Sequence, residues 1–445
     1  MDVYQEYKSK CCTADQAVQV VKDGDWVDYG MSCAYPTALD KALARRHSDL
    51  KDIKVRNAIS CHAVAILEAD PENRTFTYNL WHCSGIDRKY LDAGRAYHEP
   101  MLFRDCGSYY RRGFAPVDVA MITVAPMDRH GNFSFGLTNG CTQEMLDAAE
   151  TIIVEVNPNM PVVFGMGSDH IHVSKVQAIV ESQEPVSLAP NREPSAIDKQ
   201  IAEHIFPYLH DGITLQLGIG GMPNALGILI AESDLKDLGM HTELMSDGYL
   251  NLYNAGKITN DKKPFQRGKG VFSICMGSKE LYEFLDHNQD VLSAPMHYVN
   301  NPETIRQLDD FISINSCIAA DLYGQVCSES AGTRHISGTG GQLDFVTGAY
   351  AADHGKAFLA MPSSRVDKKG VRHSNILPKF TAGDIITTPR TQAPYMVTEY
   401  GVANLSGLAT WQRAEALINI AHPDMREDLI KAAEAQRIWR RSNKI

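Results

Sequence analysis

The sequence lacks the long apolar run that a membrane-spanning helix needs. The longest apolar stretch that we find near a core segment, residues 225–231, falls far short of the roughly 20 residues that cross a bilayer. The first six residues include early acids and no apolar segment of the kind that forms a secretory signal. We therefore expect a cytoplasmic protein with no membrane partner.

The sequence also lacks the spacings that mark metal or disulfide frameworks. Its 10 cysteines include no C-x-x-C pair and follow no regular spacing, so we expect free thiols in a reducing compartment. The segment Asp169-His170-Ile171-His172 would place two imidazoles on one face of a strand, but a third ligand is not evident. The sequence therefore predicts no metal site.

The sequence has fewer basic than acidic side chains. The chain has 43 basic and 54 acidic side chains, a formal charge of -11 at pH 7 that would repel a phosphate polymer. Nucleic acid is therefore not an expected partner. What is present is an ordinary globular composition, 44% hydrophobic and 22% charged over 445 residues, which is enough chain for two or three domains.

An internal repeat divides the chain. The pentapeptide Ser-Asp-Leu-Lys-Asp occurs at 48–52 and at 233–237, an offset of 185, and Pro36 and Pro223 precede similar helical segments at an offset of 187. A proline-rich link lies between the two copies, so we expect domains at 1–195 and 196–445. In each half, short Val/Ile-rich runs alternate with helical segments. This alternation predicts the α/β class, with two homologous open α/β halves whose mostly parallel sheets are covered by helices.

Two glycine loops mark the second half. The first, residues 218–222, follows a strand-like run and precedes a helix expected to begin at Asn224, so its amides could face an anion or a carbonyl oxygen. The second, residues 337–341, offers small residues that a bulky ligand can approach closely. The first loop matches neither the dinucleotide fingerprint nor the P-loop. The alternative interpretation is that these glycines only permit close turns.

Glu243 is the sharpest single candidate for chemistry. It lies on the strand expected after the first loop and its helix, and a buried acid costs several kcal/mol unless it is paired, which suggests a nucleophile or base. The alternative is an acid at a strand end that contacts solvent or a helix terminus. The repeat places Ala58 opposite Glu243, so carboxylate chemistry would belong to the second half. A basic pair, Lys368-Lys369, could contact phosphates or form a solvated turn.

Four motifs in order resemble the acetyl-CoA hydrolase/transferase family of CoA-transferases. They are residues 218–225, His241-Thr242-Glu243, residues 337–345 and residues 397–401. The resemblance extends over nearly the whole chain. Within the family, the flanking segments 81–89 and 438–443 are most similar to butyryl-CoA:acetate CoA-transferases, whereas residues 245–248 look closer to the 4-hydroxybutyrate type.

The resemblance implies a role for each motif. Glu243 would be the nucleophile, the amides of Ile219 and Gly341 would form an oxyanion hole, and Glu399 would orient the nucleophile. Asn300 or Asn301 would lie beside coenzyme A. The residues expected to bind the coenzyme are Gly218, Ile219, Gly220, Gly221, Met222, Asn300, Asn301, Ser337, Gly340, Gly341 and Lys369.

The resemblance further implies ping-pong transfer between a short-chain acyl-CoA, butyryl-CoA, and acetate through a glutamyl-CoA thioester. Coenzyme A would be a substrate, with no cofactor bound permanently, and the enzyme would form a homo-oligomer. Two alternatives stay open: an acyl-CoA hydrolase, in which water intercepts the same intermediate, and a nonenzymatic sensor of CoA or a nucleotide.

Overall fold

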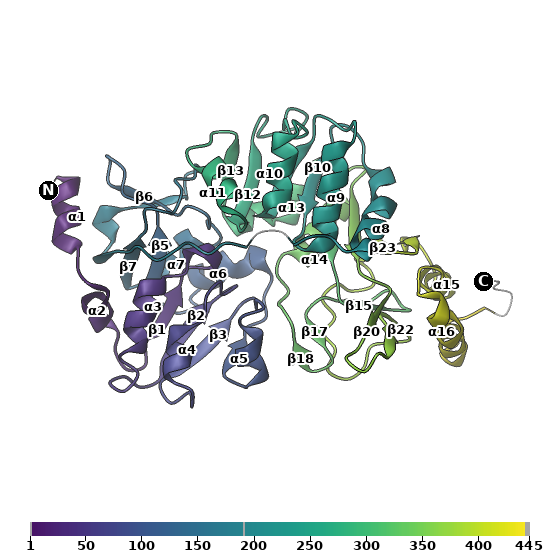
Figure 1. Ribbon diagram of the computed structural model, residues 1–445, viewed down its shortest axis with the longest axis horizontal. Helices are drawn as coiled ribbons and strands as arrows, with labels where there is room; N and C mark the ends of the chain where they lie inside the picture. Colours follow the sequence, from purple (N-terminus) through teal and green to yellow (C-terminus); the bar gives the residue numbers. More distant parts are fainter. Residues whose placement is uncertain (1, 190–191, 441–445) are drawn as a thin grey trace.

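Two large sheets organise the chain, one in each half (Figure 1). The computed structural model describes residues 2–189 and 192–440. Two residues of the proline-rich link, Pro190 and Asn191, and residues 441–443 of the flanking segment 438–443 lie outside this range. In the described residues, no helix is both long enough and apolar enough to cross a membrane.

The first sheet has seven strands in the order β4-β3-β2-β1-β5-β7-β9, and every neighbouring pair is parallel. Its strands are β1 (Trp26–Tyr29), β2 (Ile53–Asn57), β3 (Phe76–Leu80), β4 (Ala96–His98), β5 (Val119–Val124), β7 (Thr151–Val156) and β9 (Ala178–Glu181).

The second sheet has eight strands in the order β13-β12-β11-β10-β14-β19-β23-β24, and only the last pair is antiparallel. Its strands are β10 (Thr214–Leu217), β11 (Gly239–Met245), β12 (Gly270–Cys275), β13 (Val291–Ser293), β14 (Phe311–Ser316), β19 (Lys356–Ala360), β23 (Tyr395–Thr398) and β24 (Gly401–Asn404). When the strands of each sheet are counted in chain order, the first seven strands have the same spatial order in both sheets, 4-3-2-1-5-6-7. The predicted fold class, two α/β halves with mostly parallel sheets, is confirmed.

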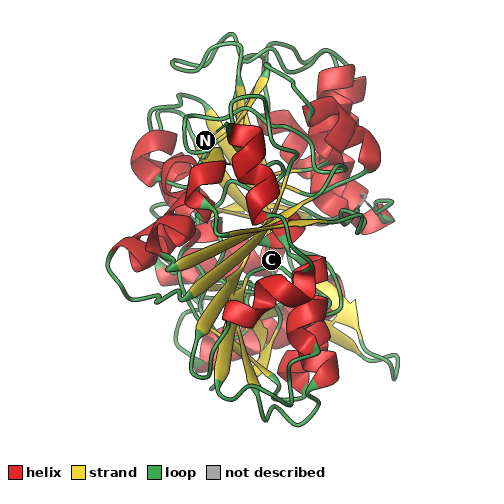
Figure 2. Cartoon of the chain, turned by 90° about the vertical axis from the view of Figure 1, so that its left-hand side faces the viewer, coloured by secondary structure: helices red, strands yellow, loops and turns green. Residues whose placement is uncertain are grey.

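Helices cover both faces of the strands (Figure 2), which explains why strands such as β5 and β12 are mostly apolar and are buried along their whole length. The first half contains α1 (Val3–Lys10), α2 (Ala14–Ala17), α3 (Thr37–Ala44), α4 (Ala65–Ala69), α5 (Arg88–Asp92), α6 (Cys106–Arg111) and α7 (Thr142–Ala148). The second contains α8 (Ala196–Ile205), α9 (Gly221–Glu232), α10 (Asp247–Asn254), α11 (Lys279–Leu285), α12 (Met296–Val299), α13 (Pro302–Ile305), α14 (Gln342–Ala351), α15 (Thr410–Asn419) and α16 (Pro423–Ala435).

Short elements complete the fold. The 3-10 turns are η1 (Val18–Val20), η2 (Ser32–Ala34), η3 (Phe103–Asp105), η4 (Val173–Lys175) and η5 (Phe206–Tyr208). The strands outside the large sheets are β6 (Asn132–Ser134), β8 (His170–His172), β15 (Ala319–Asp321), β16 (Val326–Cys327), β17 (Ser330–Ala331), β18 (Arg334–His335), β20 (Ser364–Val366), β21 (Arg372–Ser374) and β22 (Ile376–Leu377).

One helix boundary differs from the prediction. The helix expected from Asn224 begins at Gly221, three residues earlier. Pro223 does not delay it, because a proline in the first turn gives up an N–H that has no partner within the helix. Gly220 precedes the helix with a φ of 121°, a conformation that favours glycine. Pro423 is likewise tolerated in a first turn, as the first residue of α16.

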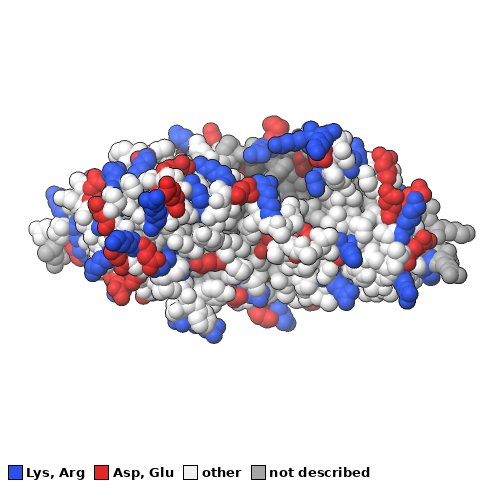
Figure 3. All heavy atoms as spheres, turned by 90° about the horizontal axis from the view of Figure 1, so that it is seen from below, with Lys and Arg blue, Asp and Glu red and all other residues white. Residues whose placement is uncertain are grey.

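The two halves share hydrophobic cores. Leu244 and Met296 of the second half pack in one cluster with Met31, Ala58 and Trp81 of the first. This shared cluster places the strand that carries Glu243 against the first half. Within the second half, α8 packs on α9. Figure 3 shows acidic and basic side chains interspersed over the face seen from below, rather than segregated by sign.

A buried ion pair stabilises the first half. Arg56 Nη1 lies 2.9 Å from Asp28 Oδ2, and the two side chains are 4% and 1% exposed. Arg56→Ala would leave the Asp28 carboxylate buried without its cation, so we expect the free energy of unfolding to fall by about 3–5 kcal/mol in urea titrations. Lys54→Ala is the control, because it removes a cation whose partner, Asp52, is largely exposed, and should cost at most about 1 kcal/mol. Equal losses in both variants would contradict this account.

Candidate active site

Glu243 lies within β11, beside the first glycine loop. Strands β10 and β11 pair in parallel with Thr214 opposite Gly239 and Leu215 opposite Met240. Continuing that register by three residues places Gly218 level with Glu243. The neighbours of Glu243 along β11 are buried, whereas its own side chain is partly exposed, so a ligand can reach a carboxylate that the protein otherwise surrounds.

Asn300 is the hydrogen-bond partner of this carboxylate. Its Nδ2 donates a short hydrogen bond to Glu243 Oε2, and the Asn300 side chain is fully buried. Asn301 has a different role. Its Oδ1 accepts a hydrogen bond from the backbone N–H of Glu303 at 2.9 Å and thereby caps α13. Of the two asparagines that the sequence left as alternatives, Asn300 is therefore the one at Glu243.

Gly341 lies against the same two side chains. A Cβ at this position would be 1.9 Å from Glu243 Oε2 and 2.2 Å from Asn300 Nδ2, distances that no side chain can accommodate. Gly341 is also the N-cap of α14, so the amides at the start of this helix lie near the carboxylate. The preceding Gly340 has a φ of 55°, and its carbonyl accepts a hydrogen bond of 3.2 Å from the backbone N–H of Phe103 in the first half.

A second acid, Asp344, lies close enough to Glu243 for their charges to interact. Asp344 on α14 is fully buried and receives Arg104 Nη1 at 3.0 Å and the Arg104 backbone N–H at 3.2 Å. Burial raises the pKa of Asp344 to about 8; Arg104 opposes this shift, and the Glu243 charge adds to it. Burial likewise raises the pKa of Glu243 to about 7, against the hydrogen bond from Asn300. Both carboxyl groups therefore have pKa values above the usual range of acids.

His241 stabilises the backbone next to Asn300. It is fully buried, and its Nε2 donates to the carbonyl of Val299 at 2.8 Å, directly before Asn300. Burial lowers the pKa of His241 to about 3, so the ring is neutral at pH 7 and Nε2 carries the proton. His241 thus fixes the backbone that presents Asn300 to Glu243.

The rest of the first glycine loop has mixed roles. Ile219 is 56% exposed, which leaves the loop tip open to a ligand. A Cβ on Gly221 would lie 2.4 Å from Asp198 Oδ2, and Met222 is buried in the core, so these two positions also serve the packing of α8 on α9.

The other predicted residues, Glu399, Ser337 and Lys369, form no hydrogen bond with Glu243 in the part of the chain that the structure describes. The Glu399 carboxylate accepts from the N–H and hydroxyl of Ser363 at 2.8 and 2.6 Å. Strand β23, which Glu399 follows, is four positions from β11, about 19 Å at normal strand spacing. The orienting role of Glu399 stays a prediction. Ser337 Oγ donates to the carbonyl of Ser328 at 2.8 Å, and Lys369 is exposed at the tip of the β20–β21 hairpin.

Sequence reasoning missed Arg104 and the role of Asp344. Asp344 lies inside the motif at residues 337–345, and its position directly after a glycine loop could have indicated a role in the site. Arg104 lies 240 residues away in the first half, outside the four motifs of the resemblance. Only the packing of the two halves brings it to Asp344. The pair of imidazoles at 170 and 172 lies on β8, where His170 is exposed.

Asn300→Asp tests the contact on Glu243. The change is nearly isosteric but replaces the Nδ2 donor with an acidic oxygen, so the pKa of Glu243 should rise and activity at pH 7 should fall about 100-fold or more. Asn301→Asp is the matched control, because aspartate caps a helix as well as asparagine does. Steady-state kinetics of the two variants would contradict the assignment if N301D lost as much activity as N300D.

Known proteins are similar to this chain over almost its entire length. Residues 1–190 match the acetyl-CoA hydrolase/transferase N-terminal domain, and residues 277–433 match the C-terminal domain of the same name. A butyryl-CoA:acetate CoA-transferase of Anaerostipes caccae is 48% identical, with 100% of both chains covered. A 4-hydroxybutyrate coenzyme A transferase of Clostridium kluyveri is 39% identical over 97% of this chain and 98% of its own. The crystal structure of RipA from Yersinia pestis is 34% identical with a TM-score of 0.90, covering 98% of this chain and 100% of its own.

Proposed function

The chain belongs to the acetyl-CoA hydrolase/transferase family and is a CoA-transferase, and we propose that it moves coenzyme A between butyryl-CoA and acetate through Glu243. The observation that carries the proposed mechanism is the Glu243 carboxylate, partly exposed and in contact with Asn300 and Gly341. No other residue is needed to form a covalent bond with the substrate.

The proposed reaction begins with the transfer of CoA to the enzyme. A Glu243 oxygen attacks the thioester carbonyl, the carbon–sulfur bond breaks, and CoA leaves as a thiolate, which yields a mixed anhydride. The thiolate then attacks the glutamyl carbonyl of that anhydride and releases butyrate. The product of this half-reaction is a glutamyl-CoA thioester.

The second half-reaction reverses these steps with acetate. Acetate attacks the glutamyl thioester and expels CoA thiolate, which next attacks the acetyl carbonyl of the new anhydride. Acetyl-CoA leaves and the Glu243 carboxylate is restored. Charge and protons balance without an external acid, because each step exchanges one anion for another.

Each attack develops negative charge on a carbonyl oxygen, and fixed N–H donors lower the energy of that oxyanion. The amide of Gly341, at the start of α14, and the amide of Ile219, at the exposed loop tip, are the proposed donors. A donor of this kind contributes about 3–4 kcal/mol to the transition state.

The rival function is hydrolysis, in which water takes the place of acetate. The test measures CoA release from butyryl-CoA with and without acetate. We expect acetyl-CoA to form only with acetate and free CoA to stay minor. Free CoA released at the same rate without acetate would exclude the transferase. Comparing 4-hydroxybutyrate with butyrate as acceptors of CoA from acetyl-CoA would decide between the two acyl types.

The pKa of Glu243 predicts the pH profile of the reaction. Only the carboxylate can attack, so kcat/KM should rise about tenfold per pH unit below 7 and level off above it. An unshifted glutamate would instead give a profile already flat at pH 6, because its pKa is about 4.3. Measurements of kcat/KM from pH 5 to pH 8 distinguish these cases.

A further inference from the structure

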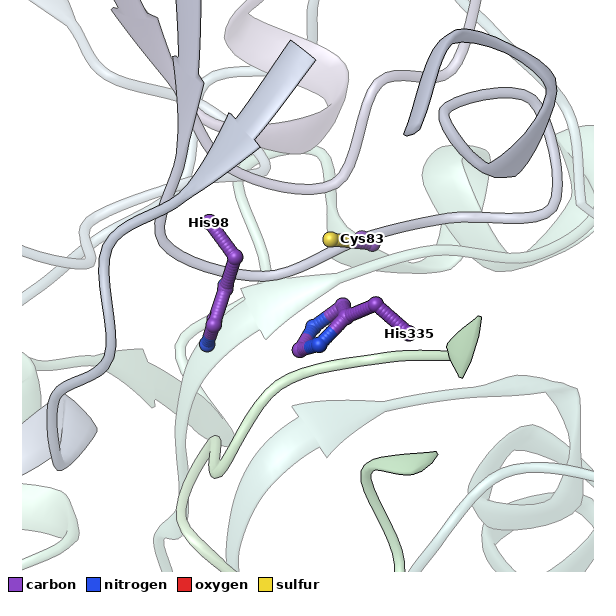
Figure 4. Close-up of side chains that lie close together, drawn as sticks. All are labelled: Cys83, His98 and His335. Atoms are coloured by element: carbon purple, nitrogen blue, oxygen red, sulfur yellow. The ribbon is translucent and has the colours of Figure 1, made fainter. Parts of the chain in front are cut away.

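Three side chains that are far apart in the sequence meet at the junction of the two halves. Cys83 and His98 come from the first half and His335 comes from β18 of the second (Figure 4). Their ligand atoms all lie within 4.8 Å of one another, the one such group of three among the described residues. We propose that Cys83, His98 and His335 bind a divalent cation of the zinc class.

The hydrogen bonds of the two histidines leave one free lone pair on each ring. His98 Nδ1 lies 2.9 Å from the carbonyl of Leu80, and because a carbonyl only accepts, this nitrogen carries the proton. His98 Nε2 is then unprotonated, and it is buried without a hydrogen-bond partner in the described residues. His335 Nε2 donates to the carbonyl of Ser337, which leaves Nδ1 unprotonated. Metal-bound histidines commonly have this second contact with a carbonyl.

Binding of a cation at this site displaces one proton. Burial raises the pKa of the Cys83 thiol, and the cation must displace its proton. On binding, the S–H bond breaks, the proton passes to solvent, and a bond forms between sulfur and the metal.

The ligand set fits the chemistry of zinc. One thiolate and two neutral imidazoles match the borderline-soft ligands that Zn²⁺ prefers, and three protein ligands leave a fourth position for water. The spacing of the cysteines in the sequence could not indicate this site, because it holds a single cysteine and its histidines lie 15 and 252 residues farther along the chain.

The site lies where the second glycine loop packs on the first half. Gly338, three residues after His335, would place a Cβ 2.9 Å from the carbonyl oxygen of Trp81 and 3.1 Å from His98 Cε1. Arg88 Nε donates to the carbonyl of Ile336 at 2.7 Å, between these residues. A cation here would fasten residues 337–341 to the first half, separately from the proposed chemistry at Glu243. This inference does not rest on the proposed function.

The test uses the full-length protein, stripped of metal with a chelator and kept reduced by a phosphine. Titration with Zn²⁺ should show one tight site per chain and release one proton, and Co²⁺ should give a thiolate-to-cobalt charge-transfer band. Cys83→Ser should remove the band, and His335→Gln, on the half-buried hairpin, should weaken Zn²⁺ binding about 100-fold or more. The variants Cys11→Ser and His170→Gln, both exposed sites elsewhere, should bind as the unaltered protein does.

The thermal midpoint provides a second readout that does not depend on activity. Zn²⁺ should raise the midpoint of the unaltered protein and leave that of His335→Gln unchanged, because only a folded site gains from the cation. Three results would overturn the proposal: a charge-transfer band that survives in Cys83→Ser, binding that is lost in Cys11→Ser or His170→Gln, or no stoichiometric Zn²⁺ binding by the unaltered protein.

Discussion

Replacing Glu243 with glutamine should reduce transferase turnover by a factor on the order of 10⁵ or more. Losses of this size follow the removal of a covalent nucleophile, because what remains is only binding and oxyanion stabilisation. Glutamine keeps an oxygen that can accept from Asn300 Nδ2, so the local packing survives. Initial rates of acetyl-CoA formation give the measurement. Turnover within tenfold of the unaltered enzyme would remove Glu243 from the mechanism.

The same variant carries a stability signature that separates a catalytic loss from a folding defect. The folded protein holds the Glu243 proton up to about pH 7, whereas an unfolded chain releases it near 4.3. The folded state therefore binds more protons in this window, and this group lowers stability as the pH rises from about 4 to 7. E243Q should show a weaker decline than the unaltered protein in urea titrations. Glu303→Gln, whose side chain is 75% exposed, should change neither turnover nor this slope.

Gly341→Ala is the second substitution with a large expected effect. The new Cβ would overlap both Glu243 Oε2 and Asn300 Nδ2, so the loop, the carboxylate or both must move. We expect kcat to fall about 100- to 1,000-fold, since a displaced amide no longer meets the oxyanion and a shift of about 1 Å in the reacting groups alone can cost 100-fold. The change should affect kcat more than the binding of CoA.

Gly85→Ala is the matched control for that substitution. A Cβ on Gly85 meets nothing within 4 Å, and the position is exposed. Its kinetics should equal those of the unaltered enzyme. If G341A retained full kcat, or if G85A lost as much as G341A, the close contact at Gly341 would have no bearing on catalysis.

The fold was predictable to the extent that local pattern and repetition determine it. The two copies of one pentapeptide, and the prolines that recur near the same offset, predicted two halves, and the seven shared strand positions agree with that prediction. Alternating apolar runs and helical segments predicted parallel sheets. The start of α9 was wrong by three residues, because a proline was treated as the helix boundary although the first turn tolerates it.

The candidate site was predictable only where its residues lie in contiguous motifs. Glu243 and Gly341 belong to such motifs, and the structure brings them together with Asn300. Arg104 and the group formed by Cys83, His98 and His335 depend on how the halves pack. Side chains that meet through tertiary packing alone leave no periodicity or spacing along the chain.

The central claim is that Glu243 carries CoA as a covalent thioester, and peptide mass spectrometry tests it most directly. The enzyme is mixed with butyryl-CoA without acetate, treated with borohydride and digested. Reduction converts a glutamyl thioester into an alcohol and leaves free carboxylates unchanged. We expect the alcohol at Glu243 in the peptide that spans β11, and not when butyryl-CoA is omitted. An intact Glu243 in every sample, or reduction at a different acid, would contradict the account.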